Sequence, residues 1–135
     1  MTMENLEKFA KPLLRIAMSL VFLYFGFQQI TAPNEWTGFV PNFALSLGVS
    51  ARGIVIANAL LELIFGALLI AGLFTRIAAL ILSLHLFGIA FSLGFNDLGI
   101  RDFGLAFATL AVFLNGADFL CLDKKFGKNK KGENV

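Results

Sequence analysis

Glu62 is the residue of this sequence best placed to do chemistry, because it lies inside an apolar segment long enough to cross a bilayer. The segment, residues 54–74, has one other polar side chain, the amide of Asn58, one helical turn before Glu62 on the same face. An ionisable group near the bilayer centre costs roughly 2.5–3.5 kcal/mol on insertion scales, so it usually faces a partner or a watery cavity. A functional site is therefore expected around Glu62, although this residue alone does not name a reaction.

His85, the single histidine, is expected to lie beside this carboxylate. Only Thr75 and Arg76 separate the segment that contains Glu62 from the apolar segment that follows it, which predicts a tight antiparallel hairpin of two spanning helices. Glu62 precedes Phe74 by twelve residues and His85 follows it by eleven. At about 1.5 Å per residue, both lie roughly 16–18 Å from the turn, near mid-bilayer. Two interpretations stay open: the pair fixes the register of the helices, or it binds or protonates a ligand such as a quinone headgroup.

A stripe with polar residues also runs along the apolar segment nearest the N-terminus, at about residues 13–30, with helical spacing. Its members are Arg15, Ser19, Phe22, Gly26 and Gln29. Arg15, at the inner end, is expected to extend to lipid phosphate. Gln29 and its neighbour Gln28, at the outer end, are expected to bond the backbone of the following loop. The candidates for ligand binding or proton relay are thus Glu62, His85, Asn58 and Gln29; no catalytic residue is assigned.

These side chains have to be positioned by helices that cross a membrane. We expect an all-α fold, an integral membrane bundle of four helices in one domain of residues 1–135, with spans at about 13–30, 54–74, 77–95 and 103–122. The long connection 31–53 mixes prolines with aromatic residues, as interfacial segments do, and we favour anchoring in the headgroup region over a lid. On the last span, the expected packing face holds Gly104, Ala108, Ala111, Asn115 and Asp118. At the turn before it, Arg101 is expected to pair with Asp97 or Asp102 and hold that turn.

Composition and charge support a membrane location. Hydrophobic residues make up 58% of the chain and charged residues 15%, and the 135 residues leave no separate soluble module. With the N-terminus inside, the cytoplasmic side holds nine of eleven basic residues: Lys8, Lys11, Arg15, Arg76, Lys124, Lys125, Lys128, Lys130 and Lys131. We therefore expect a protein of the bacterial inner membrane, with both termini and the basic tail 123–135 in the cytoplasm. The bilayer is the expected partner, and nucleic acid is not.

The residue types and motifs that the sequence lacks exclude several kinds of cofactor and metal site. One cysteine, Cys121, excludes a disulfide within the chain and a CxxC pair, and favours a structural thiol. One histidine cannot supply two haem ligands, no residue set fits an iron–sulfur cluster or zinc, and no nucleotide-binding motif occurs. We expect no metal and no covalently held cofactor, and whether the chain is an enzyme stays open.

Several short motifs, taken in order, resemble those of the DoxX family of small membrane proteins. They are Leu47-Gly48, the embedded Glu62, the turn from Gly72 to Arg76, the pair Ala78-Ala79 and the closing Gly116 and Asp123. One departure is Gln28-Gln29, where members often carry a lysine. The resemblance implies a redox-associated, quinone-interacting subunit that acts with other membrane subunits or by self-association. A non-catalytic scaffold or assembly factor is the alternative, and a small-solute or proton pathway is less favoured.

Overall fold

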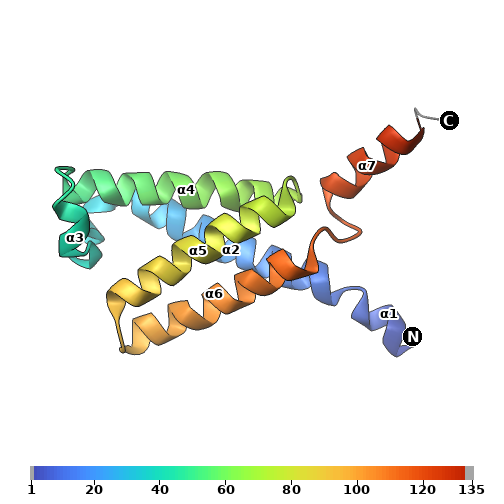
Figure 1. Cartoon of the computed structure of the whole chain (residues 1–135), viewed down its shortest axis with the longest axis horizontal. Coiled ribbons are helices and arrows are strands. Elements are labelled where there is room, and N and C mark those ends of the chain that lie inside the picture. The colour runs from blue at the N-terminus through green and yellow to red at the C-terminus, as the bar shows by residue number, and fades with distance from the viewer. Residues whose placement is uncertain (1, 133–135) are drawn as a thin grey trace.

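The computed structural model describes residues 2–132, which form helices joined by short turns (Figure 1). In chain order these are α1 (Met3–Glu7), α2 (Ala10–Thr31), the 3-10 helices η1 (Pro33–Glu35) and η2 (Thr37–Phe39), α3 (Asn42–Leu45), α4 (Ala51–Ala71), α5 (Thr75–Leu93), α6 (Asp97–Asn115) and α7 (Leu122–Gly132). The expected all-α class is confirmed for this part of the chain. Of the basic tail, residues 133–135 lie outside the described residues.

Three helical stretches of the described residues are long and apolar enough to cross a membrane: Met3–Thr31, which comprises α1 and α2, Ala51–Ala71 and Thr75–Leu93. Helix α6 is not among them. The expected last span, about 103–122, does not coincide with one helix, because α6 begins at Asp97 and already ends at Asn115. Gly116 follows Asn115 with a positive φ of 71° and an extended ψ of −162°, a conformation that glycine adopts readily, and it ends the helix.

The long helices pack mainly in two pairs, α2 with α4 and α5 with α6. Figure 1 shows that α4 and α5 meet at the turn after Ala71 and diverge toward their other ends, so their hairpin is tight only near the turn. Close approach explains the α2–α4 pair, since a Cβ on Gly26 would lie 2.8 Å from Cγ of Leu63. In the other pair, the Ser83 hydroxyl of α5 donates to the carbonyl of Ala106 at 3.1 Å.

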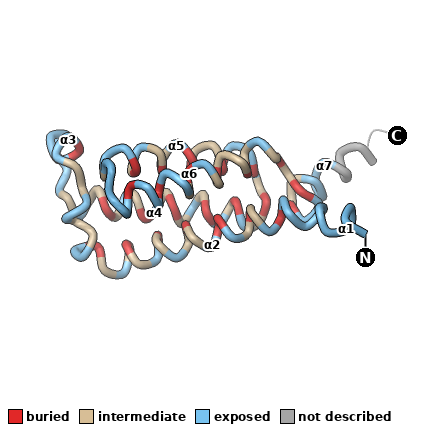
Figure 2. The backbone as a smooth tube through the Cα atoms, turned by 90° about the horizontal axis from the view of Figure 1, so that it is seen from below, coloured by how far each residue is buried: buried red, intermediate tan, exposed pale blue. Residues whose placement is uncertain are grey.

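Buried residues follow the inward sides of the long helices (Figure 2). On α2 they include the expected stripe from Arg15 to Gln29. On α6 the expected packing face is only partly buried: Gly104 is exposed and Ala108, Ala111 and Asn115 are half-buried, whereas the fully buried residues of the helix are Gly99, Asp102, Ala106, Thr109 and Val112. The fully buried stripe therefore includes a carboxylate, Asp102, in the first half of the helix.

Candidate functional site

The four candidate residues named from the sequence lie together in the structure. The Gln29 amide donates to Oε2 of Glu62 at 3.1 Å. The Asn58 amide donates to Oε1 of Glu62 at 3.3 Å and to Oε1 of Gln29 at 2.5 Å. Nε2 of His85 lies 3.6 Å from Oε1 of Glu62. One acid, two amides and one imidazole from α2, α4 and α5 thus form a single cluster.

The packing of α2 on α4 explains why Gln29 belongs to this cluster. Side chains of a helix lean toward its N-terminus, so Glu62 in the middle of α4 extends toward the end of α4 that faces the C-terminal turn of α2. Gly26, one turn before Gln29, lets the two backbones approach closely enough for the side chains to bond. Gln29 therefore bonds Glu62 and Asn58, and the expectation that it would bond the loop backbone is wrong.

The cluster holds an acid whose charge has no strong cationic partner among the described residues except His85. Glu62 is 4% exposed, and an unpaired buried carboxylate is costly. As carboxylate with imidazolium, or as carboxylic acid with imidazole, the Glu62–His85 pair has no net charge. Nε2 of His85 is buried without a hydrogen-bond partner, because 3.6 Å is too long for one. A small movement would bring the two atoms into contact and allow the pair to share a proton.

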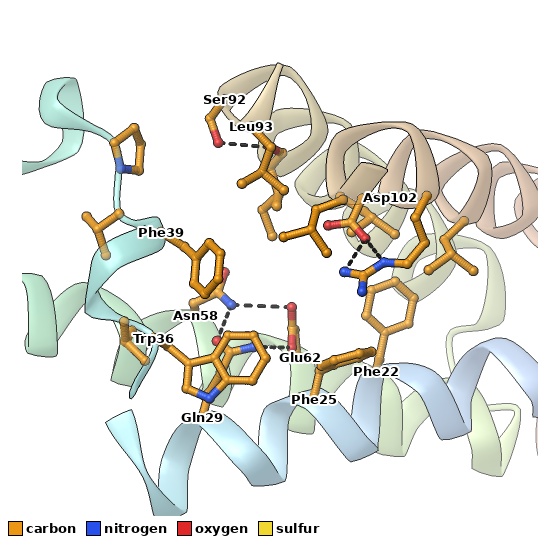
Figure 3. A pocket seen from close by; sticks show the side chains of 18 of the residues that line it. Phe22, Phe25, Gln29, Trp36, Phe39, Asn58, Glu62, Ser92, Leu93 and Asp102 are labelled. Atoms are coloured by element: carbon orange, nitrogen blue, oxygen red, sulfur yellow. Dashed lines mark hydrogen bonds and ion pairs between the residues drawn. The ribbon is translucent and has the colours of Figure 1, made fainter. Parts of the chain in front are cut away.

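A cavity of about 290 Å³ opens beside this cluster (Figure 3). Its polar residues from the cluster are Gln29, Asn58 and Glu62, whereas His85 does not line it. Its apolar walls come from all four long helices and from the segment after α2, and include Phe22, Phe25, Trp36, Phe39, Leu86 and Leu93. The cavity therefore combines aromatic walls with a buried acid–amide group, as ligand pockets commonly do.

The connection between α2 and α4 covers this cavity with its first part. Trp36 and Phe39 line the cavity, and the Trp36 ring packs against Phe25 with ring centroids 5.9 Å apart. Farther along, Phe43 and Leu47 are 70% and 76% exposed, as expected of side chains that insert into lipid. The first half of the connection thus covers the cavity, and the second half faces outward.

A second polar pair lines the cavity, and sequence reasoning missed its role there. Nη2 of Arg101 lies 2.7 Å from Oδ1 of Asp102, and the guanidinium lies 5.5 Å from the Phe25 ring centroid. The expected pairing of Arg101 with Asp102 is thus confirmed, and both residues also line the cavity, which was not expected. The signal was present, because Asp102 precedes Ala106 by four residues, on the stripe of small residues that α6 buries.

At the opposite end of the long helices, Arg15 forms a buried ion pair. Its Nε lies 2.7 Å from Oδ2 of Asp118, and Nη1 donates to the carbonyls of Leu69 and Ile70 at 2.8 and 2.7 Å. The expectation that Arg15 extends to lipid phosphate is wrong, because residues 116–121 leave the helical path and bring Asp118 back to α2. Burial alone would raise the pKa of the Asp118 carboxyl, but hydrogen bonds from Arg15 and the Leu120 N–H, with the Arg15 charge, lower it overall.

Asp123 fixes the turn between α4 and α5 from the same end. Its carboxylate accepts from the backbone N–H groups of Phe74 and Thr75 at 2.8 and 2.9 Å and from the Thr75 hydroxyl at 2.7 Å. Its own N–H donates to the carbonyl of Gly72 at 3.0 Å. Burial opposes ionisation, but these three hydrogen bonds outweigh it and lower the pKa of Asp123. The first turn of α5 thereby receives the cap that its own residues lack.

Comparison with known proteins gives a family but no individual relative. Neither a curated protein nor a solved structure matches the chain. The DoxX family model matches residues 10–94, from the first turn of α2 to the end of α5. This stretch includes Gln29, Asn58, Glu62 and His85, whereas Asp102 and Asp118 lie beyond it. The match spans more than half of the 135 residues, and the chain therefore belongs to the DoxX family.

Proposed function

We propose that this DoxX-family protein is a redox-associated subunit of a membrane complex and binds a quinone headgroup in the cavity beside Glu62. The observation that carries the proposal is a buried acid–amide cluster on the wall of an aromatic-lined cavity of about 290 Å³. A headgroup is a flat, mostly apolar ring with polar oxygens, and such a ring suits walls formed by Phe22, Phe25 and Trp36.

The polar cluster supplies the groups that a headgroup needs for binding and for proton exchange. Amide N–H groups of Gln29 or a protonated Glu62 would donate to a ring carbonyl, and a carboxylate would accept from a ring hydroxyl. His85, 3.6 Å behind the acid, would supply or remove the proton. The sequence has no cofactor motif, so electrons would reach the bound quinone from another subunit.

The same proposal includes the arrangement in the bilayer. We place α6 across the membrane as a fourth span beside α5, its main packing partner, and both termini in the cytoplasm of a bacterium. The excess of basic residues on that side supports this orientation. The cavity then lies toward the outer leaflet, under the connection that contains Trp36, and the Arg15–Asp118 pair lies toward the cytoplasm.

The single tryptophan provides a direct test, because Trp36 lines the cavity. A short-tail benzoquinone is titrated into the protein in nanodiscs, and quenching of Trp36 fluorescence is measured. We expect saturable quenching in the wild type. The reduced quinol is titrated in the same way under argon, and for this form the dissociation constant should rise about ten- to a hundredfold in Glu62→Gln, since a hydrogen bond from its hydroxyl to the charged carboxylate contributes roughly 1.5–3 kcal/mol.

Glu7→Gln, at an exposed position of α1, is the matched control and should bind as the wild type does. Quenching that rises linearly with the quinone content of the lipid, equally in all three proteins, would show collisions in the bilayer rather than a site. That result would refute the proposal and favour the scaffold role. The scaffold role would also be favoured if Glu62→Gln unfolds the protein and the wild type binds no quinone.

A further inference from the structure

We propose that Asp102 is a second ligand contact and that the cavity selects the reduced, quinol form of the headgroup over the quinone. This inference rests on the proposed function, because it concerns the same cavity. It comes from the hydrogen-bond acceptors that two carboxylates on the cavity wall leave unused.

Two carboxylates line the cavity from different helices. Figure 3 shows Glu62 on α4 and Asp102 on α6, each beside the same space. Both Arg101 bonds to Asp102 end on Oδ1, and Oδ2 receives no hydrogen bond from the described residues. Asp102 is nevertheless 6% exposed, so this free oxygen belongs to an otherwise buried side chain that lines the cavity. Asn58 adds a further acceptor, since its carbonyl oxygen has no bonded donor in the same part of the chain.

Most donors of the amide cluster on the same walls are already used. The Asn58 amide donates to Gln29 and Glu62, and the Gln29 amide to Glu62. Arg101 directs Nε and Nη2 to Oδ1 of Asp102, which leaves the other oxygen of this carboxylate free. A ligand that bonds both carboxylates needs a hydrogen-bond donor at each end.

A quinol meets this requirement and a quinone does not. The two hydroxyl groups of a 1,4-quinol point away from opposite edges of the ring, where one can donate to Glu62 and the other to Asp102. A quinone presents carbonyl lone pairs at both positions, and these face carboxylate oxygens without a proton between them. The ring itself contacts the same aromatic walls in either form, so the walls do not discriminate between the two.

The test compares both redox forms on the same protein in nanodiscs. Dissociation constants of a short-tail benzoquinone and of its separately prepared quinol are measured by isothermal titration calorimetry under argon. We expect the wild type to bind the quinol at least tenfold more tightly. A tenfold preference would raise the two-electron potential of the bound couple by about 30 mV.

The variant Arg101→Gln/Asp102→Asn removes both charges together, which leaves no unpaired ion on α6. It should bind both forms within about threefold of each other, whereas Asp97→Asn, an exposed acid on the same helix, should keep the wild-type preference. Equal binding of both forms by the wild type would overturn the inference and leave the proposed function intact. An unchanged preference in the double variant would overturn the role of Asp102. If neither form binds, the proposed function itself fails. The wild-type ratio decides the selection even where the double variant does not fold.

Discussion

Removing the charge of Asp118 should destabilise the protein strongly, although this residue lies far from the cavity along the helices. Arg15 is 2% exposed, and Asp118→Asn leaves its charge buried without a counter-ion. Breaking a buried pair in this way costs roughly 3–5 kcal/mol. The carbonyls of Leu69 and Ile70 still accept from Nη1, so we expect a loss of about 3 kcal/mol, near the lower limit.

The free energy of unfolding is measured by SDS titration in mixed micelles, with Glu7→Gln as an exposed control. The pKa of Asp118 is lowered from 3.8 in the folded protein. Its contribution to stability is therefore complete above pH 3.8 and is lost as the pH falls through the lower, folded value. The difference between wild type and Asp118→Asn should be constant near neutral pH and should shrink below pH 3.8.

Two results would refute this reasoning. One is a loss below about 1 kcal/mol at neutral pH, which is what an exposed ion pair contributes. The other is a difference between the two proteins that persists unchanged in acid. The double variant Arg15→Met/Asp118→Leu separates the cost of an unpaired charge from the value of the pair. It removes both charges and should recover most of the stability that Asp118→Asn loses.

Two further substitutions test the packing and the capping at the turn. Gly26→Ala should destabilise the protein by about 1–3 kcal/mol in the same SDS titration, because its Cβ would lie 2.8 Å from Cγ of Leu63. The control Gly104→Ala should be neutral or slightly stabilising, because its Cβ would have no neighbouring atom within 4 Å. Asp123→Asn should lower the free energy of unfolding by about 1–2 kcal/mol and speed hydrogen exchange in the first turn of α5, because Asp123 accepts hydrogen bonds from the first N–H groups there; unchanged exchange at Phe74 and Thr75 would contradict the capping role.

The pairing of Glu62 with His85 could be predicted because a short turn fixes their register. Only a few residues separate α4 from α5, so counting back and forward from the turn places both side chains at one depth. Near the turn the helices have not yet diverged far, and Oε1 and Nε2 lie 3.6 Å apart. Counting residues from the turn predicts the register of two helices wherever the connection between them is too short to adopt many conformations.

The partner of Gln29 could not be predicted in this way. Nineteen residues, 32–50, separate α2 from α4, and a connection of that length permits many registers. The register is set instead by the fit of Gly26 against Leu63 and of Gly66 against Phe22 and Leu23. Such steric fits involve residues distant in sequence, and helical spacing within one segment does not reveal them.

Asp118 and Asp102 were missed for a related reason. A continuous α6 to residue 122 would place Asp118 on a helix face, whereas Gly116 ends the helix and lets Asp118 reach Arg15. Two stripes of small residues run along α6, and helical spacing alone favours neither. Contact with α5 decides between them, and it buries the stripe that contains Asp102.

The divergence of α4 and α5 explains why the acid lies at the end of the cavity nearest the turn. Arg15 and Asp123 bond backbone groups on both sides of the turn, so the two helices are held together at that end. Toward the other end they separate, and Glu62 is the cavity-lining residue of α4 nearest the turn, as Leu86 is on α5. Toward the other end, Trp36 and Phe39 line the same cavity. The buried acid therefore lies where the two helices are still held close together, with Nε2 of His85 3.6 Å away.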